Sequence, residues 1–299
     1  MLICIAKIRM LIRGTSLLTA ILCFAALCPA GVKAEGIDTE HMFSFMIGSD
    51  VGEVGEREFQ SQATGRFTRN GGTYGVVSEE LELEFVPVPN FRVELGAAFA
   101  AHDINGVTGL DDRRQLTPQG VSADFRYRFL DREAPGSPFG LTLALESQRD
   151  RIDETSGAAA RSYGTELTLA LDREVVPNLA VAAFNLSYQP EWTRFVGLEN
   201  VDRESTLGAS VGLMAQMRPG LFLGGEARYF RRYEGIGLEE FAGHALFVGP
   251  VAYLQLSERS RLTATWSIQA WGHPAGSSAA LDLVNFERHQ ARLVFGVSF

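Results

Sequence analysis

The sequence predicts an all-β fold: an antiparallel up-and-down transmembrane β-barrel of about twelve strands, preceded by a cleavable signal peptide. Three observations lead to this prediction. The chain begins with a basic and apolar segment, apolar and polar side chains alternate from about residue 40 to the C-terminus, and short connections alternate with longer ones. No segment after Glu40 shows a sustained helical period.

The first 34 residues have the three parts of a secretory signal peptide. Basic side chains come first, residues 16–27 are apolar, and Val32-Lys33-Ala34 supplies a small-residue cleavage site. The apolar stretch is shorter than the roughly 20 residues of a transmembrane helix. We therefore expect cleavage before Glu35, with Cys28-Pro29-Ala30 as a second site. The predicted regions are a signal peptide, 1–34, and a barrel, 35–299.

The composition of the mature chain limits its chemistry. All three cysteines lie within the signal peptide, so the barrel has no disulfide and no thiolate metal site. Four of the 27 basic residues and none of the 36 acidic residues belong to the signal, which leaves a net charge of −13. This acidity argues against nucleic acid as a partner. The histidines lack ligand spacing, so the sequence predicts no metal site and no cofactor.

Each predicted strand has one apolar and one polar face. Leucine and phenylalanine alternate with glutamate in residues 80–85, and the same alternation recurs in residues 121–129 and 141–146. In water, twelve such apolar faces would expose a patch far larger than soluble monomers tolerate, which argues against a soluble barrel. The strands are predicted at about 40–51, 73–87, 91–104, 118–130, 138–151, 161–174, 178–193, 205–217, 220–233, 243–256, 260–272 and 284–299.

The connections between these strands alternate in length. The short ones are 87–90, 131–138, 177–178, 218–219 and 257–259; the longer ones are 52–72, 105–118, 152–160, 194–204, 234–242 and 273–283. A membrane barrel has tight turns on the periplasmic side, longer external loops and an even number of strands. Twelve strands then place both termini on the periplasmic side.

The closing segment carries a family resemblance. The chain ends with Ala291, Leu293, Phe295, Val297 and Phe299 in one apolar row. In this row, in its export signal and in its strand pattern, the chain resembles bacterial outer-membrane β-barrel proteins. The resemblance implies a Gram-negative outer membrane, contact with its lipid and lipopolysaccharide, and recognition of Phe299 by the barrel assembly machinery. It implies no catalytic or binding residues.

The apolar rows, taken as lipid-facing, place a set of charged side chains in the lumen. Acidic residues dominate the second, fifth and sixth predicted strands, whereas the ninth and twelfth lean basic. Opposed rows of this kind filter solutes by charge in a water-filled pore. The predicted lumenal residues are Glu80, Glu82, Glu84, Arg92, Glu94, Asp124, Arg126, Arg128, Glu146, Glu166, Asp172, Glu226, Arg228, Arg232, Arg288 and Arg292.

Three functions are compatible with these patterns. We expect a passive channel for small solutes, a porin-like function that needs no enzymatic activity. Twelve strands fall between barrels filled by side chains and barrels that leave a channel, so a plugged barrel with a structural or surface-interaction function is the alternative. An outer-membrane lipid hydrolase is a third hypothesis. By strand parity His289 faces lipid, whereas Ser267 and Ser44 face the lumen. Neither serine is then placed to act as a nucleophile beside His289.

Overall fold

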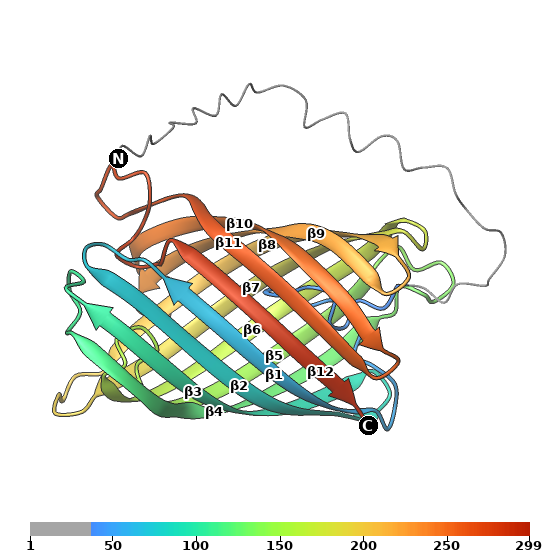
Figure 1. The fold of residues 1–299 in the computed structure, drawn as a ribbon, viewed down its shortest axis with the longest axis horizontal. Coiled ribbons are helices and arrows are strands. Elements are labelled where there is room, and N and C mark those ends of the chain that lie inside the picture. Colours follow the sequence, from blue (N-terminus) through green and yellow to red (C-terminus); the bar gives the residue numbers. More distant parts are fainter. Residues whose placement is uncertain (1–36) are drawn as a thin grey trace, which may run out of the picture. The chain divides into compact units, whose positions relative to one another are not determined.

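A computed structural model describes residues 37–299, which form one closed antiparallel barrel in which each strand pairs with its sequence neighbours and β1 pairs with β12 (Figure 1). The predicted signal peptide lies outside the described residues. No helix of the described residues could cross a membrane. The strands are β1 (Arg57–Phe67), β2 (Thr73–Val88), β3 (Phe91–Asn105), β4 (Arg113–Leu130), β5 (Gly140–Ile152), β6 (Ala159–Val176), β7 (Ala180–Phe195), β8 (Asp202–Arg218), β9 (Leu221–Glu234), β10 (Glu240–Ser257), β11 (Ser260–Pro274) and β12 (His289–Ser298).

The outer face of the barrel is apolar, as the alternation predicts. Leu83 of β2, Leu95 of β3, Val121 of β4 and Leu293 of β12 are all exposed on the outside, while the acidic and basic neighbours on the same strands turn inward. Because successive side chains of a strand point to opposite faces, this parity fixes both surfaces at once. The twelve-stranded transmembrane fold predicted from the sequence is confirmed.

The first strand was predicted in the wrong place. Residues 40–51 are not a strand, and β1 forms instead within the predicted long loop 52–72. The outward residues of β1 include Ser61, Ala63 and Gly65, which are small and give no apolar row in the sequence. Apolar residues are frequent in 40–51 for another reason, which is that this segment packs inside the barrel.

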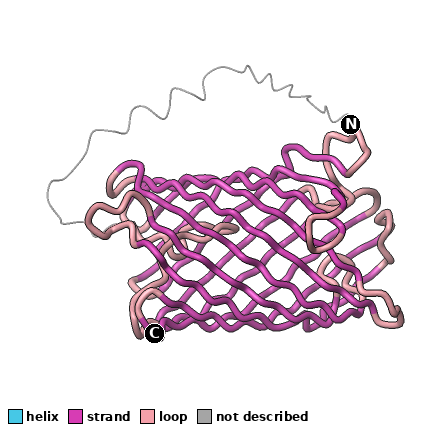
Figure 2. Tube along the Cα trace, turned by 180° about the vertical axis from the view of Figure 1, so that it is seen from behind, coloured by secondary structure: helices cyan, strands magenta, loops and turns pink. Residues whose placement is uncertain are grey.

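Residues 37–51, here called the plug segment, fill part of the lumen; Figure 2 shows loop-coloured chain inside the ring of strands. Met42, Phe43 and Met46 pack against apolar lumenal side chains of β7 to β10, including Met214 and Phe222. This cluster is an apolar core at one end of an otherwise polar lumen. Burial of such side chains stabilises the segment in place.

Wall side chains satisfy the polar groups of the plug segment. The backbone N–H of Ser49 donates to Asp172 Oδ2 (2.6 Å), and that of Ser44 to Glu226 Oε1 (2.8 Å). Asn185 accepts from the Ile47 N–H (2.8 Å) and donates to the Ile47 carbonyl (2.9 Å). Because buried backbone groups without partners are costly, these bonds specify where the segment lies.

The connections also differ from the prediction in length. Strands extend into the predicted external loops, so most connections on that side shrink to 68–72, 106–112, 153–158, 196–201 and 235–239. Strand β12 begins at His289 rather than at residue 284, which leaves 275–288 as the longest connection. At the other end, 131–139 exceeds the neighbouring turns, and its Arg132 bonds to Asp50 of the plug segment (2.6 Å) and to Asp172 of β6 (3.1 Å).

Gly212 of β8 leaves the space that the plug segment occupies. A Cβ atom at this position would lie 2.6 Å from Phe43 Cε1 and 3.2 Å from Met46 Sδ. We predict that Gly212→Ala lowers the free energy of unfolding in urea by about 1–3 kcal/mol through overpacking. The variant should also expose the plug segment to a glutamate-specific protease. Gly75→Ala is the control, because its added Cβ has only ordinary contacts, from 3.8 Å. If both variants lost the same stability, the predicted overpacking against the plug segment would be wrong.

Candidate functional site

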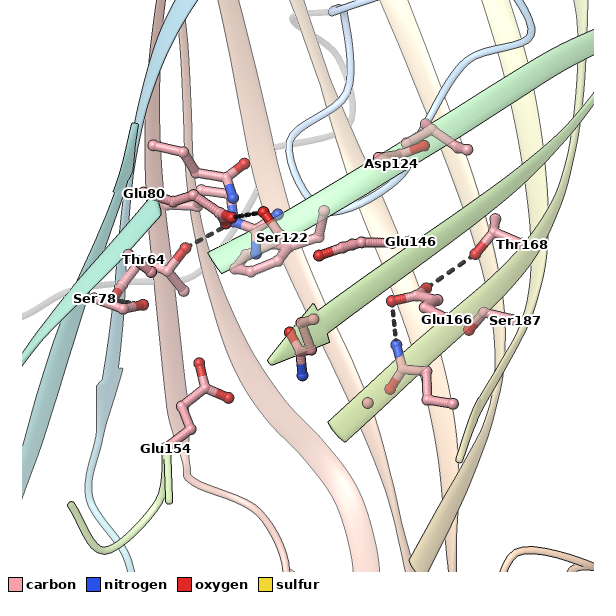
Figure 3. A pocket seen from close by; sticks show the side chains of 18 of the residues that line it. Thr64, Ser78, Glu80, Ser122, Asp124, Glu146, Glu154, Glu166, Thr168 and Ser187 are labelled. Atoms are coloured by element: carbon pink, nitrogen blue, oxygen red, sulfur yellow. Dashed lines mark hydrogen bonds between the residues drawn. The ribbon is translucent and has the colours of Figure 1, made fainter. Parts of the chain in front are cut away.

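The lumen beyond the plug segment holds a polar cavity of about 470 Å³ (Figure 3). Residues 40–47 of the plug segment line one end, and Glu154 and Asn285 from the connections at the other end bend inward to line it as well. Charged side chains make up much of the lining. They are the acids Glu40, Glu80, Glu82, Glu94, Asp124, Glu146, Asp150, Glu154, Glu166, Glu191, Glu204 and Glu287 and the arginines Arg66, Arg69, Arg92, Arg126, Arg228, Arg232, Arg261 and Arg292.

Strands β2 and β5 to β7 give the cavity an acidic wall. Its carboxylates bond to neutral donors: Ser122 donates to Glu80 (2.5 Å), and Thr168 (2.9 Å) and Gln189 (2.5 Å) donate to Glu166. Among residues 37–299, no arginine, lysine or histidine forms a salt bridge with the members of this wall, which are Glu80, Glu82, Glu146, Asp150, Glu166 and Glu191.

Strands β9, β12 and β1 give the cavity a basic wall. The guanidinium groups of Arg228 and Arg292 lie over the ring of Phe45, 3.7 Å and 4.2 Å from its centre. Arg292 also donates to Thr64 Oγ1 (2.9 Å) and to the Ser44 carbonyl (3.2 Å). The arginines nearest the plug segment therefore hold its central aromatic side chain by cation–π contacts.

A dense ion-pair network lies where the plug segment meets β2, β3 and β4. Arg92, whose side chain is 1% exposed, pairs with Glu40 (2.5 Å), Glu84 (3.4 Å) and Glu94. Arg126 pairs with Glu94 (3.1 Å) and Asp124 (3.0 Å). Buried charges must be paired to be tolerated, so the network ties the plug segment to the wall electrostatically.

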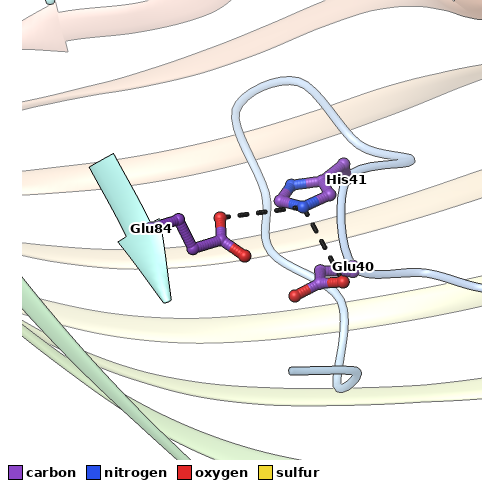
Figure 4. Close-up of side chains that lie close together, drawn as sticks. All are labelled: Glu40, His41 and Glu84. Atoms are coloured by element: carbon purple, nitrogen blue, oxygen red, sulfur yellow. Dashed lines mark ion pairs between the residues drawn. The ribbon is translucent and has the colours of Figure 1, made fainter. Parts of the chain in front are cut away.

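His41 lies at the edge of this network and faces three carboxylates. Its Nε2 atom is 3.7 Å from Glu40 Oε2, from Glu84 Oε2 and from Glu58 Oε1 (Figure 4 shows the first two). Burial, followed by the guanidinium groups of Arg261 and Arg92, holds the pKa of His41 well below its ordinary value. An imidazole in its neutral form offers a nitrogen lone pair to a ligand.

The structure places the predicted lumenal residues in three locations. Glu84, Arg128, Asp172 and Glu226 lie beside the plug segment. Arg288 directly precedes β12, is exposed and does not line the cavity, so its lumenal position stays a prediction. The others line the cavity: Glu80, Glu82, Arg92, Glu94, Asp124, Arg126, Glu146, Glu166, Arg228, Arg232 and Arg292.

The sequence prediction missed the plug segment as part of the site. Glu40, His41 and Phe45 were predicted to belong to a strand of the wall. Their contacts with Arg92, Glu84 and Arg228 were therefore not predicted. The signal available in the sequence was Gly48, three positions before Val51, because a glycine inside an apolar strand pattern weakens that pattern. A Cβ at Gly48 would collide with Thr39.

His289 lies on the outer face next to Trp266. The indole Nε1 donates to His289 Nδ1 at 3.4 Å, and the two rings are 5.9 Å apart. Ser267, the serine adjacent in sequence to that tryptophan, is buried. Within residues 37–299, no hydrogen bond joins His289 to a serine, threonine or carboxylate, so the described structure gives the lipid-hydrolase hypothesis no nucleophile and base pair.

Comparison with known proteins agrees with this architecture. The model of a family described as "Family of unknown function (DUF6662)" matches residues 35–299. No curated protein matches the chain. The solved COG4313 outer membrane channel from Pseudomonas putida F1 is similar, with 12% identity, a TM-score of 0.58, and coverage of 84% of this chain and 98% of that one. The translocator domain of autotransporter NalP from Neisseria meningitidis aligns with 17% identity, a TM-score of 0.48, and coverage of 84% and 91%. The Pseudomonas likeness shows that the fold is shared.

Arg92 is the residue on which the ion-pair network depends. We predict that Arg92→Ala lowers the free energy of unfolding by about 3–5 kcal/mol, since three buried carboxylates lose their common partner. Urea unfolding followed by gel mobility of the unheated barrel measures this. Arg288→Ala, an exposed arginine, should change stability by less than about 0.5 kcal/mol. A small loss for Arg92→Ala would mean that the network contributes little.

Proposed function

The chain belongs to the DUF6662 family, and from this premise we propose that it is an outer-membrane channel for small polar solutes, closed in the present conformation by the plug segment. The observation that carries the proposal is the charged cavity inside a transmembrane barrel. The protein from Pseudomonas putida F1 that shares its fold is described as an outer membrane channel, which supports the location and the activity. Transport is passive and needs no cofactor.

The charge pattern of the lumen supports a preference for cations. Acidic side chains outnumber arginines in the lining, and those of the acidic wall face the cavity without a basic partner among the described residues. A water-filled passage between low-dielectric walls concentrates ions of the opposite sign. The basic wall across the lumen adds a transverse field, which orients solutes that carry both charges.

The plug segment determines whether the passage conducts. Its apolar side chains and its bonds to Asp172, Asn185 and Glu226 hold it at one end of the cavity. The polypeptide chain of the plug segment continues into the wall of the barrel where β1 begins, at Arg57. A lumen closed by a separate segment can open when the segment moves, whereas a lumen filled by side chains of the wall cannot. This difference favours a channel over a plugged barrel with a structural function.

Orientation and assembly follow from the same proposal. Both chain ends of the barrel meet at the end with the shorter connections, because Glu58 pairs with Ser298. We place this end, and with it Phe299, in the periplasm, where the assembly machinery reads the last strand. The longer connections then face outward, next to lipopolysaccharide.

Removal of the plug segment tests the channel directly. We predict that deletion of residues 37–51 converts a barrel of low conductance into one with steady single-channel steps in planar bilayers. Heat-modifiable gel mobility confirms that the variant is folded. A folded deletion variant that stays electrically silent would refute the channel and would favour the structural barrel.

Selectivity is tested in the same deletion background. We predict that Glu146→Gln with Glu166→Gln moves the reversal potential in a KCl gradient toward that of chloride, since two lumenal carboxyl groups without a salt bridge are lost. Arg292→Gln, on the opposite wall, is the matched control and should move the potential toward that of potassium. Variants that all leave the reversal potential unchanged would show that these side chains do not set selectivity.

A further inference from the structure

We propose that Glu40, His41 and Glu84 bind one divalent transition-metal ion of the Zn²⁺ type, which joins the plug segment to strand β2. Glu40 and His41 belong to the plug segment, and Glu84 to the barrel wall. Their nearest ligand atoms all lie within 4.8 Å of one another. No pattern in the sequence indicates this group, because His41 and Glu84 are 43 positions apart and meet only through the fold.

The distances suit coordination by a single ion. His41 Nε2 is 3.7 Å from both Glu40 Oε2 and Glu84 Oε2 (Figure 4). Two ligand atoms bound at about 2.1 Å to one tetrahedral ion lie about 3.4 Å apart. The two pairs that include His41 therefore need to close by about 0.3 Å, and the ligand atoms of Glu40 and Glu84 lie within 4.8 Å of each other. At 3.7 Å these atoms are too far apart to hydrogen-bond to each other.

The ring nitrogens of His41 and the carboxylate oxygens of Glu84 form no hydrogen bond within residues 37–299. The Glu84 side chain is 3% exposed and pairs with Arg92 at 3.4 Å. Arg92 Nη1 lies 2.5 Å from Glu40 Oε1 and 3.4 Å from Glu84 Oε1, so it orients both carboxylates and leaves both Oε2 atoms toward the imidazole. A cation at this position would bind the two Oε2 atoms that face the imidazole.

The charge of the surrounding network leaves room for a divalent ion. Salt bridges and the contacts of His41 connect five carboxyl groups to three guanidinium groups, so acidic groups outnumber basic ones in the network. A cation is attracted to such a site. The members are Glu40, Glu58, Glu84, Glu94 and Asp124 with Arg92, Arg126 and Arg261.

The donor set selects the kind of ion. Ca²⁺ takes six to eight oxygen ligands, whereas an imidazole nitrogen with two carboxylates is typical of Zn²⁺ and its neighbours. Glu58 Oε1, 3.7 Å from His41 Nε2 on another side and bonded to Arg261, is placed to become a further ligand. Both Glu40 and His41 line the cavity, so an ion reaches the site from the lumen.

Metal titration of the full-length barrel tests the site. The protein is refolded in detergent, stripped with EDTA, dialysed and titrated with ZnCl₂ in a calorimeter. We expect one ion per chain. His41→Ala and Glu84→Gln should each weaken binding by more than the roughly 10- to 100-fold that loss of an outer-sphere partner costs. Because Glu84→Gln keeps the size of the side chain, it remains informative if His41→Ala folds poorly.

His273→Ala is the matched control. His273 and His244 lie away from the proposed site and form a close histidine pair, with ring centres 4.3 Å apart. Binding that survives His41→Ala and Glu84→Gln but is lost in His273→Ala would overturn the proposal, and so would the absence of Zn²⁺ binding. Diffraction at the zinc absorption edge should place a single peak between His41 Nε2 and Glu84 Oε2; a peak elsewhere would contradict it.

The effect on the passage is a separate measurement, and this step rests on the proposed function. An ion shared by the plug segment and β2 stabilises the closed conformation by its binding free energy. EDTA should therefore raise the open probability of the wild-type barrel, and added ZnCl₂ should restore closure. Because calorimetry and diffraction need no conductance, the metal site and the channel can fail independently.

Discussion

The bonds between the plug segment and the lumenal wall are the interactions on which the state of the lumen depends. An irregular segment inside a barrel brings unpaired backbone groups with it, and each must find a partner. Asp172 illustrates the solution, because one carboxylate accepts from Thr39 Oγ1 (2.6 Å), from the Ser49 N–H (2.6 Å) and from Ser49 Oγ (2.7 Å). Arg132 compensates the charge of this carboxylate from outside the strands.

The same requirement explains the uneven connections. Tight turns suffice where a strand only reverses, as between β8 and β9. The connection 131–139 is longer because it carries Arg132 into the lumen, and 275–288 is longer because it folds over the opposite end of the cavity, where the Arg69 guanidinium donates to the Val284 carbonyl (3.0 Å). The two long connections of this barrel are therefore those that contribute side chains or backbone groups to the ends of the lumen.

Most of the fold could be predicted from the sequence because membrane strands encode two surfaces in one alternation. Leu81, Leu83 and Glu82 were assigned to their faces by parity alone, and the structure agrees. Parity fails where the apolar row is not lipid-facing. Phe43 and Met46 are apolar because they pack against Met214, and Phe59 and Ala63 are too weak a row to mark β1. Apart from Gly48, the local sequence does not distinguish these apolar residues, which face a plugged lumen, from apolar residues that face lipid.

The site was less predictable than the fold, since charge partners in a barrel come from distant strands. Parity identified Glu146 and Glu166 as lumenal, but it could not say whether arginines neutralise them. The structure separates the two cases. Arg92 pairs with Glu40 and Glu94 beside the plug segment, while Glu146 and Glu166 form no salt bridge within the described residues.

This separation argues for a function of the acidic wall beyond stability. Carboxylates gathered on one wall repel one another and lower the stability of the barrel, and a network that served only to brace the wall would pair each with an arginine. Arg228 and Arg292 lie across the same lumen, yet they contact Phe45 instead. In the channel proposed above, water that enters the lumen would solvate these carboxylates in place of arginine partners.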